Sequence, residues 1–140
     1  MITKEELKNH YNLVREIQDL QEEIKQLQSV SKTASAVQYG SAGGNTGNSD
    51  TIGAKLAKLN DLMEYYVLKV EESLEQRERI EKEIESLPVN ERRLMRYRYI
   101  DGLDWVHVAS KLNYSWRNMH RIHARILEKL KDGTQWHTKS

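Results

Sequence analysis

Basic and amide side chains gather at the start of one expected helix, which runs from Ser115 to about Lys131. Arg117 and Arg121 lie four residues apart and therefore share one helix face. A guanidinium can donate two parallel hydrogen bonds to O6 and N7 of guanine, and an Asn amide can bond adenine in a similar way. This chemistry is typical of side chains that distinguish the bases of duplex DNA. The expected base-reading residues are the outward ones of the first turns, Trp116, Arg117, Asn118, His120 and Arg121.

A second set of residues has the chemistry needed to hold DNA phosphates. Ser115 stands at the expected N-cap of the same helix, where free backbone N–H groups attract an anion. Contacts from Arg and Lys to phosphate give affinity and salt dependence without choosing a sequence. The expected backbone-contacting residues are Ser115, Arg92, Arg93, Arg96, Arg98, Lys111 and Arg125.

A short helix is expected directly after Pro88. Asn90 can cap it, and it covers residues 91–100. The sequence Asp101-Gly102 ends it, because glycine tolerates the left-handed backbone that closes a helix. This helix is expected to bury Leu94, Tyr97 and Ile100.

The next two helices have the sequence pattern of a helix-turn-helix. Asp104 is expected to cap residues 105–112, and Ser115 to cap the last helix. Ala109 is small enough for two helices to cross closely, and Asn113 suits a left-handed turn between them. In this arrangement the last helix enters the major groove of DNA. The small core between the helices is expected to consist of Val108, Leu112, Met119 and Ile122.

Charge divides the chain at the same place. Residues 1–87 hold 11 basic and 16 acidic side chains, a net charge of −5. Residues 88–140 hold 11 basic and 5 acidic side chains, a net charge of +6. This asymmetry is typical of an acidic part that faces protein joined to a basic part that faces phosphate.

Two long amphipathic helices are predicted in the acidic part. The first covers residues 3–29 and begins with a capping box between Thr3 and Glu6. The second is capped by Asp50 or Thr51, covers residues 54–87, and stops before Pro88. Both have apolar seams with coiled-coil spacing, although Ser73 and Arg77 interrupt the second. The seam residues are Leu13, Ile17, Leu20, Ile24 and Leu27 in the first helix, and Leu56, Leu59, Met63, Tyr66, Val70, Ile80, Ile84 and Leu87 in the second.

Residues 31–53 are rich in Gly, Ser, Ala, Asn and Thr. With few large apolar groups to offset the entropy of ordering, this segment is predicted to be a flexible loop. An antiparallel hairpin or pairing with another copy of the chain would bury the two seams, and the sequence leaves both arrangements open.

Other functional classes lack the residues they need. No apolar run approaches the roughly 18 residues that span a bilayer, and residues 1–6 lack the apolar stretch of a secretory signal. The absence of Cys removes disulfides and thiolate metal sites and fits a cytoplasmic protein. His107, His120 and His123 lack the further ligands that zinc requires. Because no nucleophile–base or paired-carboxylate arrangement stands out, we expect neither an enzyme nor a cofactor or metal site.

The sequence has Leu87-Pro88 before Glu91-Arg92, then a run from Arg98 to Leu103, Ala109 and Leu112, Tyr114-Ser115, Arg121-Ile122 and a run from Leu127 to Leu130. With these residues, the segment 87–130 resembles region four of bacterial sigma factors. It is more similar still to the sigma-region-four-like regulators of phages and prophages, the ArpU/RinA type. The resemblance implies control of late phage genes in the host cytoplasm through promoter-proximal DNA, and contact with host RNA polymerase. Trp116-Arg117 and His120 depart from the family's Arg-rich pattern, so the usual −35 promoter sequence is not implied.

These observations predict an all-α chain in three parts. Residues 1–87 form an acidic, coiled-coil-like helical hairpin with the loop 31–53, residues 88–133 a helix-turn-helix domain, and residues 134–140 a tail. The expected partners are double-stranded DNA, host RNA polymerase and further copies of the chain through helices 3–29 and 54–87, with no membrane. Two alternatives stay open, a small-terminase-like DNA packaging protein and a sigma-like module that binds polymerase without DNA.

Overall fold

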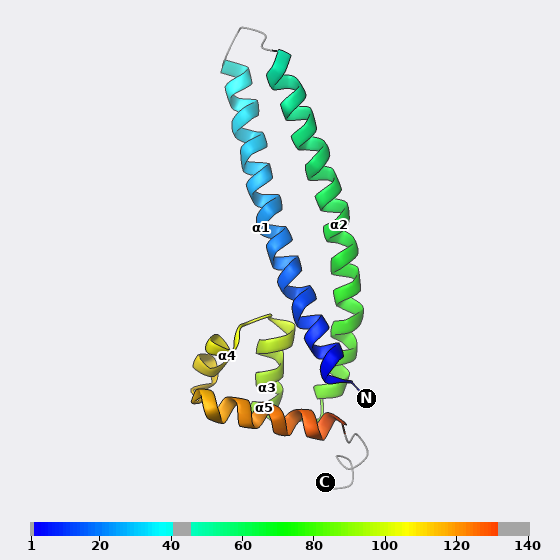
Figure 1. The fold of residues 1–140 in the computed structure, drawn as a ribbon, viewed down its shortest axis with the longest axis vertical. Coiled ribbons are helices and arrows are strands. Elements are labelled where there is room, and N and C mark those ends of the chain that lie inside the picture. The colour runs from blue at the N-terminus through cyan, green and yellow to red at the C-terminus, as the bar shows by residue number, and fades with distance from the viewer. Residues whose placement is uncertain (1, 41–45, 132–140) are drawn as a thin grey trace. The chain divides into compact units, whose positions relative to one another are not determined.

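The computed structural model describes residues 2–40 and 46–131, with the backbone alone over residues 31–40 and 46–50. Every element of secondary structure in this part of the chain is helical, which confirms the all-α class. No helix in the described ranges is both long and apolar enough to cross a bilayer. The elements are α1 (Lys4–Gly40), α2 (Thr46–Ile84), α3 (Val89–Met95), η1 (Arg96–Ile100), α4 (Trp105–Leu112) and α5 (Trp116–Lys131) (Figure 1).

The chain forms two compact units. The large unit combines residues up to Arg15 with residues from Glu72 onward, and the small unit covers residues 16–71. The helices α1 and α2 are continuous, so each contributes residues to both units. The compact unit that holds α3 to α5 therefore also holds segments of the acidic part of the chain.

In the small unit, α1 and α2 run side by side in opposite directions (Figure 1). Leu20 of α1 and Leu59 of α2 are buried. The Gln21 side-chain amide donates a hydrogen bond to the Tyr66 hydroxyl at 2.8 Å. Apolar burial and a polar cross-link together hold this pair of helices.

Two positions of the predicted seam of α2 are not buried within the chain. Leu56 and Met63 have exposed fractions of 46% and 43%, whereas Leu59 is buried and Tyr66 is half-buried. Apolar side chains occur on more than one side of α2, so more than one register fits the same spacing. Packing against α1 selects the register that contains Leu59 and Tyr66.

The predicted loop 31–53 is wrong for most of its length. The helix α1 continues to Gly40, and α2 begins at Thr46 and not at a cap on Asp50 or Thr51. Extending an existing helix adds a hydrogen bond for each residue fixed without the cost of a new nucleus, and no Pro interrupts these segments. Residues 41–45 of the predicted loop and the predicted tail 134–140 lie outside the described residues.

The junction between α2 and α3 differs from the prediction by a few residues. The last residue of α2 is Ile84, although Leu87 was predicted. Leu87 lies in a tight turn, where its backbone N–H donates to the Ile84 carbonyl at 3.0 Å. The N-cap of α3 is Pro88 and not Asn90, because the Pro88 carbonyl accepts the first helical bond from the Arg92 N–H at 2.9 Å.

The helix after Pro88 changes its hydrogen-bonding pattern halfway. At η1, a π-helical turn, the Asp101 N–H donates to the Arg96 carbonyl, five residues back, at 2.9 Å. Leu94 is buried as predicted, but Met95 and Tyr99 complete the buried side. The predicted Tyr97 and Ile100 are only partly buried, because the wider turn shifts the inward face.

The core of the large unit joins segments from both ends of the chain. Ile2 and Leu7 pack in the same cluster as the end of α2 and the short helices. The buried His10 donates from Nδ1 to the Gln76 side-chain oxygen at 2.8 Å, which ties α1 to α2. The remaining buried members are Ile80, Ile84, Leu87, Leu94, Met95, Tyr99, Val108, Ala109, Leu112, Met119, Ile122, Ile126 and Leu130.

The geometry that joins α4 to α5 agrees with the sequence prediction. The Asp104 carboxylate caps α4 by accepting from the His107 N–H at 3.0 Å. Asn113 adopts the left-handed conformation, with φ of 57°. The Ser115 hydroxyl caps α5 by accepting from the Asn118 N–H at 3.1 Å. These local constraints set the angle at which α5 leaves the turn.

Candidate nucleic-acid interface

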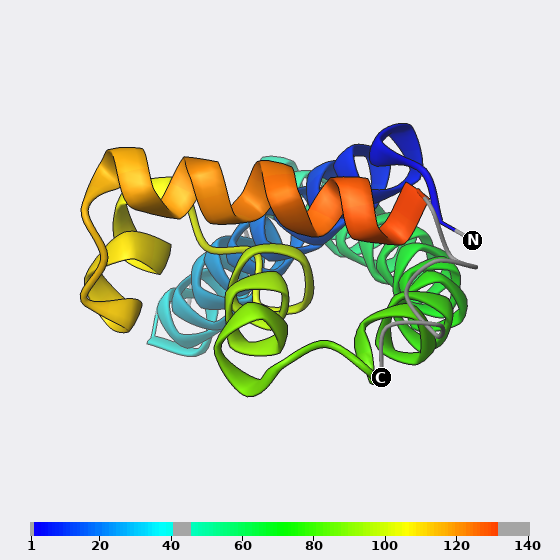
Figure 2. The same ribbon diagram turned by 90° about the horizontal axis from the view of Figure 1, so that it is seen from below.

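Three arginines lie on one exposed side of α5. Arg117, Arg121 and Arg125 follow one another at intervals of four residues and are all exposed. Met119 and Ile122, on the opposite side of the helix, are buried. In Figure 2, α4 lies beside the N-terminal half of α5. Since the apolar side faces the core, the three guanidinium groups point outward; we call this set the arginine row.

One member of the arginine row is held in place by a neighbour. An Arg121 Nη atom donates a hydrogen bond to Asn118 Oδ1 at 2.7 Å. The backbone N–H of Asn118 is in turn bound by the Ser115 hydroxyl. The predicted residues Ser115, Asn118 and Arg121 are therefore brought together at the start of α5. A pre-oriented guanidinium loses less side-chain entropy when it binds a partner.

Aromatic rings surround the predicted residue His120. Trp116 is 54% exposed, and its ring centroid lies 4.4 Å from that of His120 in an edge-on arrangement. The ring centroid of Trp105, in α4, lies 5.1 Å from that of His120. The exposed indole of Trp116 offers an apolar surface beside the arginine row, suited to a thymine methyl or a sugar.

Arg98 does not join the arginine row. Its guanidinium carbon lies 3.6 Å from the Tyr11 ring centroid and 4.2 Å from the Trp105 ring centroid. One Nη donates to the Leu103 carbonyl at 3.2 Å, and Nε is buried with no hydrogen-bond partner. Burial lowers the pKa of Arg98 below its ordinary value. We assign Arg98 to packing inside the large unit, in place of the phosphate contact expected from sequence.

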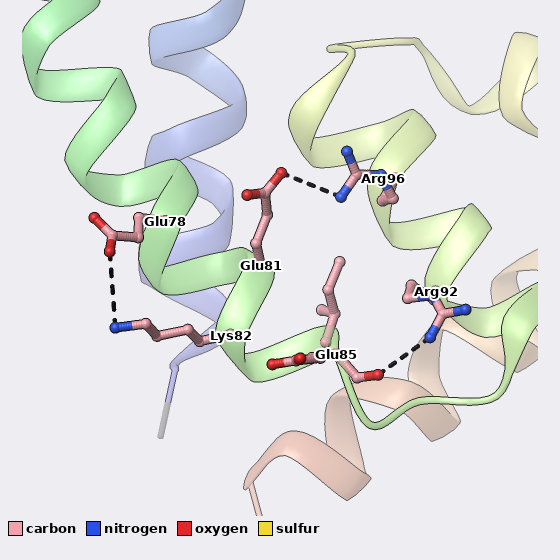
Figure 3. A pocket seen from close by; sticks show the side chains of 7 residues that line it. Glu78, Glu81, Lys82, Glu85, Arg92 and Arg96 are labelled. Atoms are coloured by element: carbon pink, nitrogen blue, oxygen red, sulfur yellow. Dashed lines mark hydrogen bonds and ion pairs between the residues drawn. The ribbon is translucent and has the colours of Figure 1, made fainter.

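Arg92 and Arg96 face the end of α2 across a groove of about 460 Å³ (Figure 3). Arg96 forms an ion pair with Glu81 at 3.1 Å, and Arg92 donates to the Glu85 backbone carbonyl at 3.1 Å. Desolvation raises the pKa of Glu81, but hydrogen bonds and positive charge from Arg77 and Arg96 outweigh it and hold this pKa below its ordinary value. The groove is lined by Glu78, Glu81, Lys82, Ile84, Glu85, Arg92 and Arg96.

The two remaining predicted phosphate contacts flank one aromatic ring. Arg93 donates to the Tyr97 hydroxyl at 3.2 Å. Lys111 of α4 places Nζ 5.8 Å from the centroid of the same ring. Both cations are exposed. They form a second basic position, separate in sequence from the arginine row.

His123 is half-buried in the large unit. Its Nε2 and the Tyr99 hydroxyl form a hydrogen bond of 2.8 Å, and its ring lies 4.5 Å from the Trp105 ring between centroids. Burial, together with the electrostatic influence of His120, Arg98 and Lys4, lowers the pKa of His123 to about 4. Among the described residues, no three potential metal ligands come together.

Sequence reasoning missed the groove beside α2. None of the site residues expected from the sequence lies in α2, yet Glu81 of this helix forms ion pairs with Arg77 at 3.2 Å and with Arg96 at 3.1 Å. The available signal was an acidic row at helical spacing, Glu78, Glu81 and Glu85, in a chain that also holds a basic row at Arg92 and Arg96. An acidic row on one helix and a basic row on another attract each other when the two helices lie close together.

Comparisons of the chain with protein-family models, curated proteins and solved structures find no match.

Proposed function

We propose that this chain is a sequence-specific, double-stranded DNA-binding transcriptional regulator that uses α4 and α5 as a helix-turn-helix. In this proposal α5 enters the major groove, and Arg117, Asn118 and Arg121 contact base edges. Trp116 and His120 contribute to base recognition beside them. Ser115, Arg93, Lys111 and Arg125 hold phosphates, and Arg92 and Arg96 join them when released from α2.

The observation that carries the proposal is the position of the arginine row. Arg117 and Arg121 are exposed at the N-terminal half of α5, and Asn118 orients Arg121. The left-handed Asn113 and the two side-chain caps fix how α5 leaves α4. An exposed basic helix on a capped turn is the arrangement that reads DNA in helix-turn-helix proteins.

The likeness of residues 87–130 to sigma region four extends the proposal to regulation. It points to control of phage late genes, with host RNA polymerase as a second partner and the bacterial cytoplasm as the place of action. The large apolar side chains that α2 leaves exposed, among them Leu56, Met63 and Val67, support an oligomer. We propose no catalytic role and no cofactor.

Binding of the full chain to duplex DNA tests the proposal. The parent protein is used to select its preferred sequence from random duplexes, and affinity is then measured at about 50 and about 200 mM salt. Arg117→Ala and Arg121→Ala are each expected to cost about 1–3 kcal/mol on the selected duplex. Lys58→Ala, which removes an exposed cation of the small unit, serves as the matched control and should leave affinity unchanged.

Two outcomes would favour one of the alternative functions over the proposed one. If both arginine variants bind DNA like the parent while the chain retains RNA polymerase, a sigma-like module without DNA contact is the correct function. If the chain assembles into rings of many copies and selects DNA ends, a packaging protein is correct. Absent or salt-insensitive DNA binding by the parent contradicts the proposal directly.

A further inference from the structure

In the small unit, α2 carries a second apolar row that does not pack against α1. Leu56, Met63 and Val67 have exposed fractions of 46%, 43% and 52%. They lie roughly 70° around the helix from the side that contains Leu59 and Tyr66. A row of large apolar side chains left in water is unusual and commonly marks a contact surface.

The spacing of this row is that of a two-stranded coiled coil. Leu56, Asn60, Met63 and Val67 follow one another in steps of four, three and four residues, and the half-buried Val70 follows three residues later. This assigns Asn60 and Val67 to a positions, and the other three residues to d positions. A β-branched residue at a and Leu at d favour two strands, and one Asn at an a position sets their register.

Among the residues of the small unit whose side chains the structure describes, no second exposed apolar row faces this one. On the part of α1 in this unit whose side chains are described, Val30 is the sole large apolar residue that is exposed. The seam residues Ile17, Leu20, Ile24 and Leu27 are buried or half-buried. A second copy of the chain supplies an identical row, with its own Asn60. In a parallel, in-register pair the two Asn60 side chains meet and can hydrogen-bond, whereas an antiparallel pair would set each Asn against an apolar d residue.

Charge favours the same orientation. The e positions beside the row hold Glu64 and Glu71, and the g positions hold Leu59 and Tyr66. In a parallel pair, e positions face g positions of the other copy, so each Glu meets an uncharged residue. In an antiparallel pair, e positions face each other and bring carboxylates together, which is unfavourable.

We infer that α2 pairs in parallel and in register with α2 of a second copy through Leu56, Asn60, Met63, Val67 and Val70. This pairing stands on the small unit alone and does not depend on DNA binding. A dimer of this kind holds two copies of α4 and α5, as recognition of two half-sites requires.

The mass of the full chain in solution provides the first test. The parent is expected at twice the 16.4 kDa of one chain, and the double variant Met63→Glu, Val67→Glu at the mass of one chain. Leu68→Glu is the matched control, because Leu68 is 63% exposed on the same helix but lies off the row. It should remain a dimer. Circular dichroism must show that all three keep their helical content.

Cross-linking tests the orientation. The parent has no Cys, so Asn60→Cys introduces a single thiol. Mild oxidation is expected to join two Asn60→Cys chains by a disulfide, since facing a positions of a parallel pair come within bridging distance. Leu68→Cys should stay mostly unlinked under the same conditions.

Three results would overturn the inference: a monomeric parent, equal disruption by Leu68→Glu, or Asn60→Cys chains that do not cross-link. Each can be told apart from a failure of the proposed function. The arginine variants test DNA contact and leave the row intact, whereas the row variants change mass without touching α5.

Discussion

The Arg121 guanidinium and the Asn118 side-chain oxygen are joined by a 2.7 Å hydrogen bond on the exposed side of α5. Both residues were expected to contact bases. In the structure they also contact each other, and the Asn118 side chain orients Arg121. The Ser115 hydroxyl holds the Asn118 backbone, and the Asn118 side chain holds Arg121. Asn118 thus restricts the Arg121 side chain in the protein without a bound partner.

Asn118→Ala is expected to weaken binding to the selected duplex by about 0.5–1.5 kcal/mol, the usual net value of one hydrogen bond. Part of that loss comes from a less ordered Arg121, so the effects of Asn118→Ala and Arg121→Ala should not add. A double-mutant cycle on DNA affinity measures the coupling. Strict additivity would show that Asn118 does not orient Arg121.

The Glu81 carboxylate competes with DNA for Arg96 in the proposed interface. Glu81→Gln frees this guanidinium and removes a negative charge, so affinity for DNA is expected to rise by about 0.2–1 kcal/mol at low salt. The gain should shrink at high salt because exposed charges are screened. Affinity of the full chain is measured by fluorescence anisotropy.

Glu78→Gln is the matched control for this change. Glu78 lines the same groove, but its carboxylate pairs with Lys82 at 3.8 Å. Glu78→Gln changes the net charge by the same amount as Glu81→Gln but does not release Arg96. An equal gain from both variants would mean that net charge alone is responsible and that the Glu81–Arg96 pair has no special effect.

The left-handed turn at Asn113 makes a prediction about stability. Its φ of 57° is costly for most residues and nearly free for glycine. Asn113→Ala is expected to lower the free energy of unfolding by about 1–2 kcal/mol, and Asn113→Gly to change it little. Urea denaturation followed by circular dichroism provides the comparison. An alanine variant as stable as the glycine variant would contradict a strained turn.

Features that depend on a few neighbouring residues were predictable from the sequence. The caps at Asp104 and Ser115, the turn at Asn113 and the end of the helix before Gly102 all match the structure. Each is decided by side-chain bonds or backbone sterics within about four residues. For the same reason the position of the exposed arginines on α5 followed from helical spacing.

Features decided by distant partners were not predictable. Arg98 looks like any surface arginine until Tyr11, from the other end of the chain, covers it. The spacing in α2 fits two apolar rows, and only packing against α1 shows that Leu59 belongs to the buried one. The loop was placed from composition, which underestimates how far a helix extends once it has formed.

The contact between His123 and Tyr99 links protonation to stability. The pKa of His123 is lowered to about 4 in the folded chain from an ordinary value of 6.5. Between these two values the unfolded chain therefore binds a proton that the folded chain does not. The contribution to stability is complete above about pH 6.5 and is lost as the pH falls toward 4. A shift of this size corresponds to about 3 kcal/mol at most.

His123→Gln should therefore flatten the dependence of unfolding free energy on pH between about 4 and about 6.5. The Gln side chain can still accept the Tyr99 hydroxyl hydrogen, but it has no proton to gain. Some dependence should remain, because burial also lowers the pKa of His10. Equal slopes for His123→Gln and the parent in urea titrations would show that His123 is protonated as easily in the folded chain as in the unfolded one.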